Sequence, residues 1–176
     1  METNIQSGRF SLWEVLRPLS LPVLETMKFK PRLLQNPWED SVLSRNADWT
    51  FVDYPSLRSL TIEDPSRDKS LLPALEEEFR LFLDRIPVLA TLYLSGNMGS
   101  SSLIRAVEGT SSEINVLTIN DYSTSTDKIT EVLRARKENG LKPRRLHYTG
   151  QLYDVDTDDV LNIWKILADE VYLGQI

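Results

Sequence analysis

The stretch LATLYLSGN, residues 89–97, places three leucines in a distinctive spacing: apolar, two others, apolar, one other, apolar. The same spacing recurs, complete in three segments and weaker in two, at Leu24, Leu57, Ile114, Pro143 and Ala168. Because side chains alternate between the two faces of a strand, the last two apolar residues of each copy lie on one face. The repeat therefore predicts a series of short strands, each with one buried face.

Helix-like segments separate these copies, which follow one another at intervals of 25 to 33 residues. Ser, Thr or Asp stands before most of the segments, where a side-chain oxygen can cap the first turn. Gly140 follows one segment, and we expect it to adopt the left-handed conformation that ends many helices. The predicted helices cover residues 12–16, 37–43, 71–85, 101–107, 126–138 and a last segment that begins near residue 157.

Two fold classes alternate strands and helices in this way: the doubly wound parallel sheet and the repeat solenoid. A central strand of a doubly wound sheet is buried on both faces and is apolar throughout. Here the residues beside the apolar positions are often polar, as at Lys28, Thr61 and Thr118. We therefore predict an α/β fold of the solenoid class: a short leucine-rich repeat solenoid with parallel strands on the concave face and helices on the convex face.

The chain resembles the leucine-rich repeat family, because residues 89–97 match its L-x-x-L-x-L-x-x-N hallmark in full. Other copies depart from the hallmark, with Pro65 and Tyr122 at the position of the asparagine. The phrases LPVLETMKF, residues 21–29, and YPSLRSLTIED, residues 54–64, look like repeats of fungal F-box-like proteins.

This resemblance covers about residues 20–176 and implies the substrate-recognition repeats of an F-box-type ubiquitin-ligase receptor. In that family an F-box binds the adaptor of a cullin ligase, whereas the repeats hold a substrate. The chain contains no recognisable F-box helical segment. The resemblance therefore implies the cullin-ligase adaptor as a partner only if an F-box lies outside this chain.

The pattern divides the chain into two parts. We expect residues 1–20 to form an N-terminal helical segment and residues 21–176 to form an array of about five irregular strand–helix units. A solenoid normally needs a polar cap at each end, and the last residues, VYLGQI, provide little polarity. We therefore expect either a fragment of a longer protein or an array that a partner closes.

The polar residues between the apolar positions predict a column across the open face of the sheet. Its members are Lys28, Thr61, Tyr93, Thr118, His147 and Tyr172, with Arg145 beside it. Tyrosine and arginine often contribute much of the binding energy in protein interfaces. We predict a non-enzymatic module that binds another protein on this face. The alternative interpretation of the column is a solvated sheet surface without a partner.

The segment SGNMGSSS, residues 95–102, suits a second class of function. A glycine-rich loop that opens a helix can bind phosphate. This segment lacks the lysine of a P-loop and the spacing of GxGxxG, and a turn followed by a serine cap also explains it. The alternative function is a small α/β enzyme or phosphate-binding protein that uses the Ser95–Ser102 loop. A third class is a structural or homo-oligomeric module.

Composition excludes several kinds of site. The chain has 176 residues, no Cys and one His, with a formal net charge of −6. It therefore has no disulfide framework, no thiolate zinc site and no two-histidine metal site. We predict no catalytic residues, no metal and no cofactor.

No apolar run reaches the 18 or more residues of a membrane-spanning helix, and the N-terminus lacks the apolar stretch of a signal peptide. We therefore predict no membrane partner and an intracellular location, in the cytoplasm or the nucleus.

Charge is unevenly distributed along the chain. Residues 128–145 are mainly basic, and residues 151–176 are mainly acidic. The asymmetry predicts either a docking surface or neighbouring repeats that complement each other. Nucleic acid is a disfavoured partner because the chain is acidic overall and no nucleic-acid-binding motif accompanies the basic residues.

The segment DVDTDD, residues 154–159, lacks the sixth-position glycine of a calcium loop, so we interpret it as a turn and a helix N-cap.

Overall fold

The computed structural model describes residues 2–7, 24–31, 54–64, 73–96, 100–120, 124–150, 152 and 156–174. Within these residues, seven parallel strands form one sheet, and their spatial order is their order in the sequence. The strands are β1 (Glu2–Ser7), β2 (Thr26–Pro31), β3 (Ser59–Asp64), β4 (Thr91–Gly96), β5 (Val116–Asn120), β6 (Arg145–Tyr148) and β7 (Glu170–Leu173).

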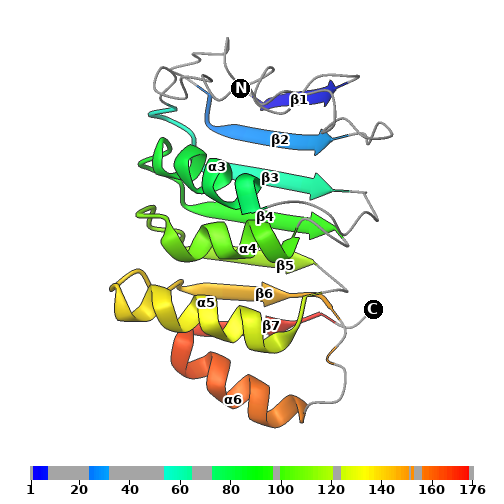
Figure 1. Ribbon diagram of the computed structural model, residues 1–176, viewed down its shortest axis with the longest axis vertical. Coiled ribbons are helices and arrows are strands. Elements are labelled where there is room, and N and C mark those ends of the chain that lie inside the picture. Colours follow the sequence, from blue (N-terminus) through cyan, green and yellow to red (C-terminus); the bar gives the residue numbers. More distant parts are fainter. Residues whose placement is uncertain are drawn as a thin grey trace.

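The described helices alternate with the strands from β3 onwards. They are α3 (Pro73–Asp84), α4 (Ser100–Gly109), α5 (Thr126–Glu138) and α6 (Thr157–Leu167). Figure 1 shows them as a single layer that covers one face of the sheet, and each helix packs against the next one along the chain. The chain is therefore an α/β protein with an all-parallel sheet, which confirms the α/β class and the parallel strands that the sequence predicted.

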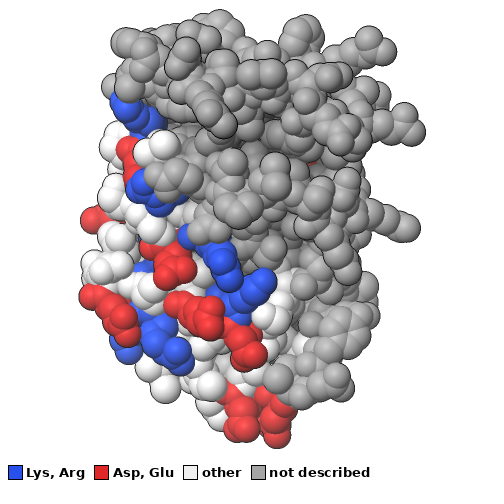
Figure 2. All heavy atoms as spheres, viewed as in Figure 1, with Lys and Arg blue, Asp and Glu red and all other residues white. Residues whose placement is uncertain are grey.

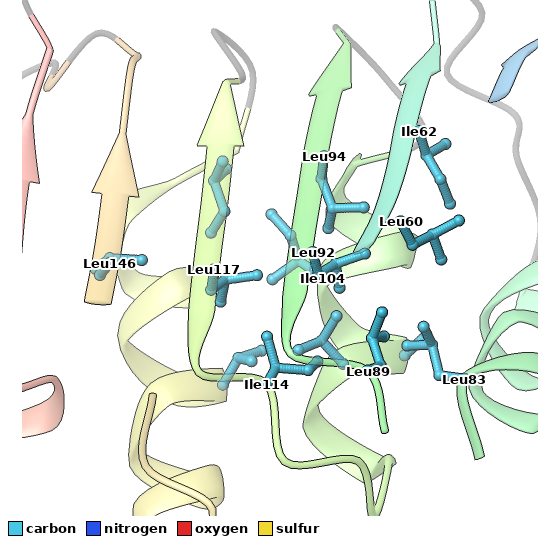
Figure 3. Close-up of a cluster of buried hydrophobic side chains, with 14 of the residues drawn as sticks. Leu60, Ile62, Leu83, Leu89, Leu92, Leu94, Ile104, Ile114, Leu117 and Leu146 are labelled. Carbon is cyan, nitrogen blue, oxygen red and sulfur yellow. The ribbon is translucent and has the colours of Figure 1, made fainter. Parts of the chain in front are cut away.

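The predicted alternation of side chains is present in the strands. In β4, Leu92 and Leu94 are buried and Tyr93 between them is partly exposed; in β5, Leu117 and Ile119 are buried in the same way. The buried side chains point from the strands towards the helices (Figure 3). Burying an aliphatic side chain of this size stabilises the fold by about 1.5–3 kcal/mol, so this layer is the main apolar core.

The residue before each strand makes the same pair of hydrogen bonds in three successive units. Its carbonyl oxygen accepts from two consecutive backbone N–H groups at the start of the next strand. The carbonyl of Glu25 accepts from Arg58 and Ser59, that of Arg58 from Ala90 and Thr91, and that of Ala90 from Asn115 and Val116, at 2.9–3.0 Å. The recurrence shows that these units are equivalent in backbone as well as in sequence.

Two helix N-caps and one helix C-terminus agree with the sequence predictions. Ser125 caps α5, and the Asp156 carboxylate caps α6 by accepting from the Asp158 N–H at 2.9 Å. Gly140 follows α5 with a φ of 74°, a conformation in which a Cβ atom would be strained. Asp156 is therefore a helix N-cap, as we interpreted the segment DVDTDD.

The beginning of the chain differs from the prediction. Residues 2–7, part of the segment expected to be helical, form strand β1 and pair in register with β2. The sequence ETNIQS contains one apolar residue, Ile5, so no alternation indicates a strand there. Strand β1 is instead formed by its backbone pairing with β2, and the local sequence does not reveal such a pairing between distant segments. The helices predicted at 12–16 and 37–43 lie outside the described residues.

Among the residues that the structure describes, no helix has the length and apolar character needed to cross a membrane.

The core prediction can be tested on two adjacent residues of β5. Leu117 is buried and Val116 is partly exposed on the opposite face. We expect Leu117→Ala to lower the free energy of unfolding by about 2–5 kcal/mol, because it leaves a cavity between the sheet and the helices. Val116→Ala is the matched control and should change it by less than about 1 kcal/mol. Urea denaturation followed by circular dichroism measures both; equal effects would contradict the assignment of faces.

Candidate functional site

The predicted column is assembled in register by the sheet. Successive strand pairs align its members across six neighbouring strands, in the order Lys28, Thr61, Tyr93, Thr118, His147 and Tyr172. They alternate with the buried residues and therefore lie on the face of the sheet opposite the helices. Thr61, Tyr93 and Thr118 are partly exposed, and Tyr172 is 50% exposed.

The centre of the column contains a side-chain pair from neighbouring strands. The Asn120 Nδ2 group of β5 donates to the Tyr93 hydroxyl of β4 at 3.2 Å. The Asn120 Oδ1 atom is buried and accepts no hydrogen bond from the described residues. A buried acceptor without a donor is costly, so this atom has unused hydrogen-bonding capacity beside the column.

The C-terminal end of the column is a cluster of four linked side chains from β6 and β7. The rings of His147 and Tyr172 are tilted against each other, with centroids 4.7 Å apart. Arg145 donates through Nε to Glu170 Oε2 at 2.7 Å, and the Tyr172 hydroxyl donates to the same oxygen at 3.0 Å. The hydrogen bond from Arg145, and secondarily that from Tyr172, lowers the pKa of Glu170.

Glu170 was absent from the residues predicted for this face. A signal for it exists, because Arg145 and Glu170 each stand two residues after the start of a weak copy of the repeat, at Pro143 and Ala168. The register confirms this equivalence by pairing the two residues directly. A closer comparison of the weak copies would have placed Glu170 beside Arg145.

The N-terminal end of the column also contains a paired charge. Lys28 Nζ lies 2.5 Å from Glu63 Oε1, and both side chains are partly exposed. The two ends of the column therefore each combine one basic and one acidic side chain. Because these charges compensate each other, the described part of the face offers hydroxyl, amide and aromatic groups rather than a field of one sign.

The basic stretch 128–145 does not form a separate patch. Lys142 Nζ lies 2.6 Å from Asp169 Oδ1, and Arg145 pairs with Glu170, so basic residues before β6 and on it meet acidic residues of the C-terminal segment. Figure 2 shows acidic and basic side chains intermixed over the described part of the helix-covered face. Of the two interpretations left open by the sequence, these contacts favour complementary neighbouring repeats.

Arg136, in the middle of the basic stretch, is completely buried. Its guanidinium donates to the carbonyl oxygens of Val107 at 2.8 Å and Ser112 at 2.7 Å, and more weakly to that of Thr110 at 3.4 Å. Burial lowers the pKa of Arg136 to about 10, which leaves it protonated at neutral pH. This side chain of α5 thus caps the end of α4 and does not contribute to a basic surface.

The loop that receives Arg136 also binds α3. The Asp84 carboxylate accepts from the Thr110 hydroxyl at 2.8 Å and from the Ser111 N–H at 2.8 Å. The Ser112 hydroxyl donates to the Leu83 carbonyl oxygen at 2.8 Å. Residues 110–112 therefore connect three consecutive helices, on the side of the sheet opposite the column.

Only the two ends of the Ser95–Ser102 loop lie within the described residues. Ser95 and Gly96 end β4, Ser100 begins α4, and residues 97–99 lie outside the described residues. Elsewhere, no three metal-ligating side chains of the described chain gather in one place.

Comparison with known proteins adds no relative: no family model, no curated protein and no solved structure matches the chain.

The role of Arg136 can be tested with one substitution. We expect Arg136→Met to lower the free energy of unfolding by about 2–4 kcal/mol, because the carbonyls of Val107 and Ser112 lose their buried donor. Arg134→Met removes an exposed arginine from the same helix and should change it by less than about 0.5 kcal/mol. Chemical denaturation of both variants gives the comparison. Equal, small losses would mean that Arg136 is not a structural donor.

The cluster at β6 and β7 predicts a pH dependence. The Glu170 carboxylate should titrate below its ordinary range, so its contact with Arg145 is intact at neutral pH and disappears as the pH falls through the lowered pKa. Carboxyl-carbon NMR of the labelled protein measures that pKa. Arg145→Gln should raise it, and Tyr172→Phe should raise it less. An unchanged pKa in Arg145→Gln would show that the contact is absent in solution.

Proposed function

We propose that the chain is a non-enzymatic protein-binding module built as a short leucine-rich repeat solenoid. The observation that carries the proposal is the column of partly exposed side chains, aligned in register on the face of the sheet that none of the described helices covers. Its partner is another protein, which lies across this face.

Three features of the fold support the solenoid interpretation. The strands follow one another in sequence order, every pairing is parallel, and the described helices form one layer. A doubly wound sheet would instead carry helices on both faces and bury its central strands completely. Thr61, Tyr93 and Thr118 are partly exposed, which is the outcome that favours a solenoid over the alternative enzyme fold.

The side-chain contacts on the face support binding over a merely solvated surface. Tyr93 is held by Asn120, and Tyr172 contacts both His147 and Glu170. Aromatic side chains that neighbours already hold lose less conformational entropy when a partner binds. Tyr93 and Tyr172 are therefore the anchors that we assign to the interface.

The biological role that we propose rests on the resemblance of residues 21–29 and 54–64 to repeats of fungal F-box-like proteins. In that role the face binds the substrate of an F-box-type ubiquitin-ligase receptor, in the cytoplasm or the nucleus. The cullin-ligase adaptor is a partner of the same receptor only where an F-box lies outside this chain.

Affinity capture of the full-length gene product with quantitative mass spectrometry tests the proposal. We expect cullin-ligase components together with a substrate. The double variant Tyr93→Ala, His147→Ala should reduce recovery of the substrate at least about tenfold, because it removes two side chains of the central column. Recovery of the ligase components should stay unchanged, since they bind elsewhere.

Arg134→Ala, Lys137→Ala is the matched control, because both side chains are exposed on α5 at the other face of the molecule. It should leave substrate recovery intact. Reproducible absence of ligase components would reject the receptor role. Equal loss of the substrate in both double variants would reject the sheet face as the binding surface.

A further inference from the structure

The middle of the binding face is uncharged. Strands β3, β4 and β5 direct polar and small side chains to it, and all of them are partly exposed. We call this block the uncharged centre, and its members are Ser59, Thr61, Thr91, Tyr93, Ser95, Val116, Thr118 and Asn120. The strand register aligns them in rows, with Tyr93 between Thr61 and Thr118. The helix-covered face, by contrast, carries intermixed acidic and basic side chains (Figure 2).

Charged side chains at the borders of the uncharged centre are paired with each other. On the side of β2, Lys28 pairs with Glu63, and on the side of β6, Arg145 pairs with Glu170. Each pair cancels its own charge, so neither provides a net charge that could neutralise a charged group of a partner. A charged group placed on Tyr93 would therefore lose its water without gaining a counter-ion from the described residues, and that loss is costly.

The hydrogen-bonding groups of the uncharged centre suit an uncharged partner. Most of them are hydroxyl groups, as at Thr61, Thr91 and Thr118. A hydroxyl group both donates and accepts, so it can bind an amide N–H or a carbonyl oxygen equally well. Protein interfaces in general contain few charged residues in their core and place polar residues at their rim. The face has this arrangement, because an uncharged centre lies between paired charges.

We propose that the partner presents an uncharged segment of polypeptide to this centre, with hydroxyl, amide or small apolar side chains. The inference rests on the binding face proposed above and names the chemistry of the segment that this face binds. Amide and carbonyl groups of the segment bind the hydroxyl groups, and its apolar groups pack on the Tyr93 ring and on Val116. Because no net charge is involved, the affinity depends little on the salt concentration.

The proposal separates the partner from the classes that are recognised by charge. Nucleic acids, phosphorylated peptides and anionic membrane surfaces bind through clustered lysine and arginine side chains. On this face Lys28 and Arg145 lie at opposite ends of the column, and each is already paired with a carboxylate. They therefore do not form a cluster that could hold a phosphate group, and the uncharged centre between them favours a neutral segment.

Peptide selection tests this chemistry before the partner is known. A phage-displayed library of random peptides, drawn from all residue types, is selected on the immobilised full chain, and peptides that also bind the Tyr93→Ala variant are discarded. We expect the remaining peptides to share a core without Asp, Glu, Lys or Arg. As synthetic peptides they should keep their dissociation constants within about twofold between low and high salt, because salt screens only charged contacts.

Two charge substitutions at one position sharpen the test. Thr118→Lys and Thr118→Glu each add a charge to the uncharged centre, and both should weaken binding of a selected peptide at least about tenfold, because either charge is covered without a counter-ion. A peptide recognised through its own charge would instead bind one of these variants more tightly than the native chain. Lys137→Glu, at an exposed position of α5, is the control and should leave the affinity unchanged. Circular dichroism verifies folding, and the same pair of substitutions at Thr61 replaces a variant that does not fold.

The outcomes separate this inference from the proposed function. A Tyr93-dependent peptide that requires an acidic or a basic residue would overturn the inference and leave the binding face intact. Opposite effects of Thr118→Lys and Thr118→Glu would do the same. Failure to select any Tyr93-dependent peptide would also overturn it, because an uncharged segment would then not be sufficient for binding. The proposed binding face fails by a different result, the equal loss of the captured substrate in both double variants.

Discussion

The burial of two alternating apolar residues in each of the strands β3–β6 against the layer of described helices is the constraint on which the rest of the structure depends. Leu92 and Leu94 of β4, and their equivalents in β5, must face the helices because their side chains form the core. Since a strand has a period of two, the residue between them must point the other way. Parallel pairing in register then aligns these residues into a column, so the candidate binding face follows directly from the core.

A second constraint joins the helices to one another. The end of α4 leaves carbonyl groups without partners within the helix, as every helix end does. Arg136 of α5 supplies donors to those groups, and Asp84 of α3 binds the loop that follows them. The helix layer is therefore held by polar contacts at one loop as well as by apolar packing. The burial of a charged side chain without a described carboxylate partner is tolerated because backbone carbonyls surround it.

Much of this arrangement could be predicted from the sequence, and the exceptions have physical reasons. The repeat spacing located β2–β7 and the members of the column, because both follow from local alternation. Gly140 and the N-caps were also local signals. The structural role of Arg136 was hidden within the basic stretch 128–145, because nothing near it in the sequence indicates that carbonyl groups 24–29 residues away need donors. Strand β1 depends on pairing with β2, and the contact of Glu170 with Arg145 depends on the register of two strands.

The in-order topology has a consequence for how the molecule moves. The principal contacts of each described element join it to its immediate neighbours, so a disturbance at one end need not disrupt the other. The loop 110–112 makes α3, α4 and α5 the exception, because a single opening there would release three helices together. Backbone amides in this central block should exchange with solvent as one cooperative unit. The face that we assign to binding thus crosses a block whose three helices open together.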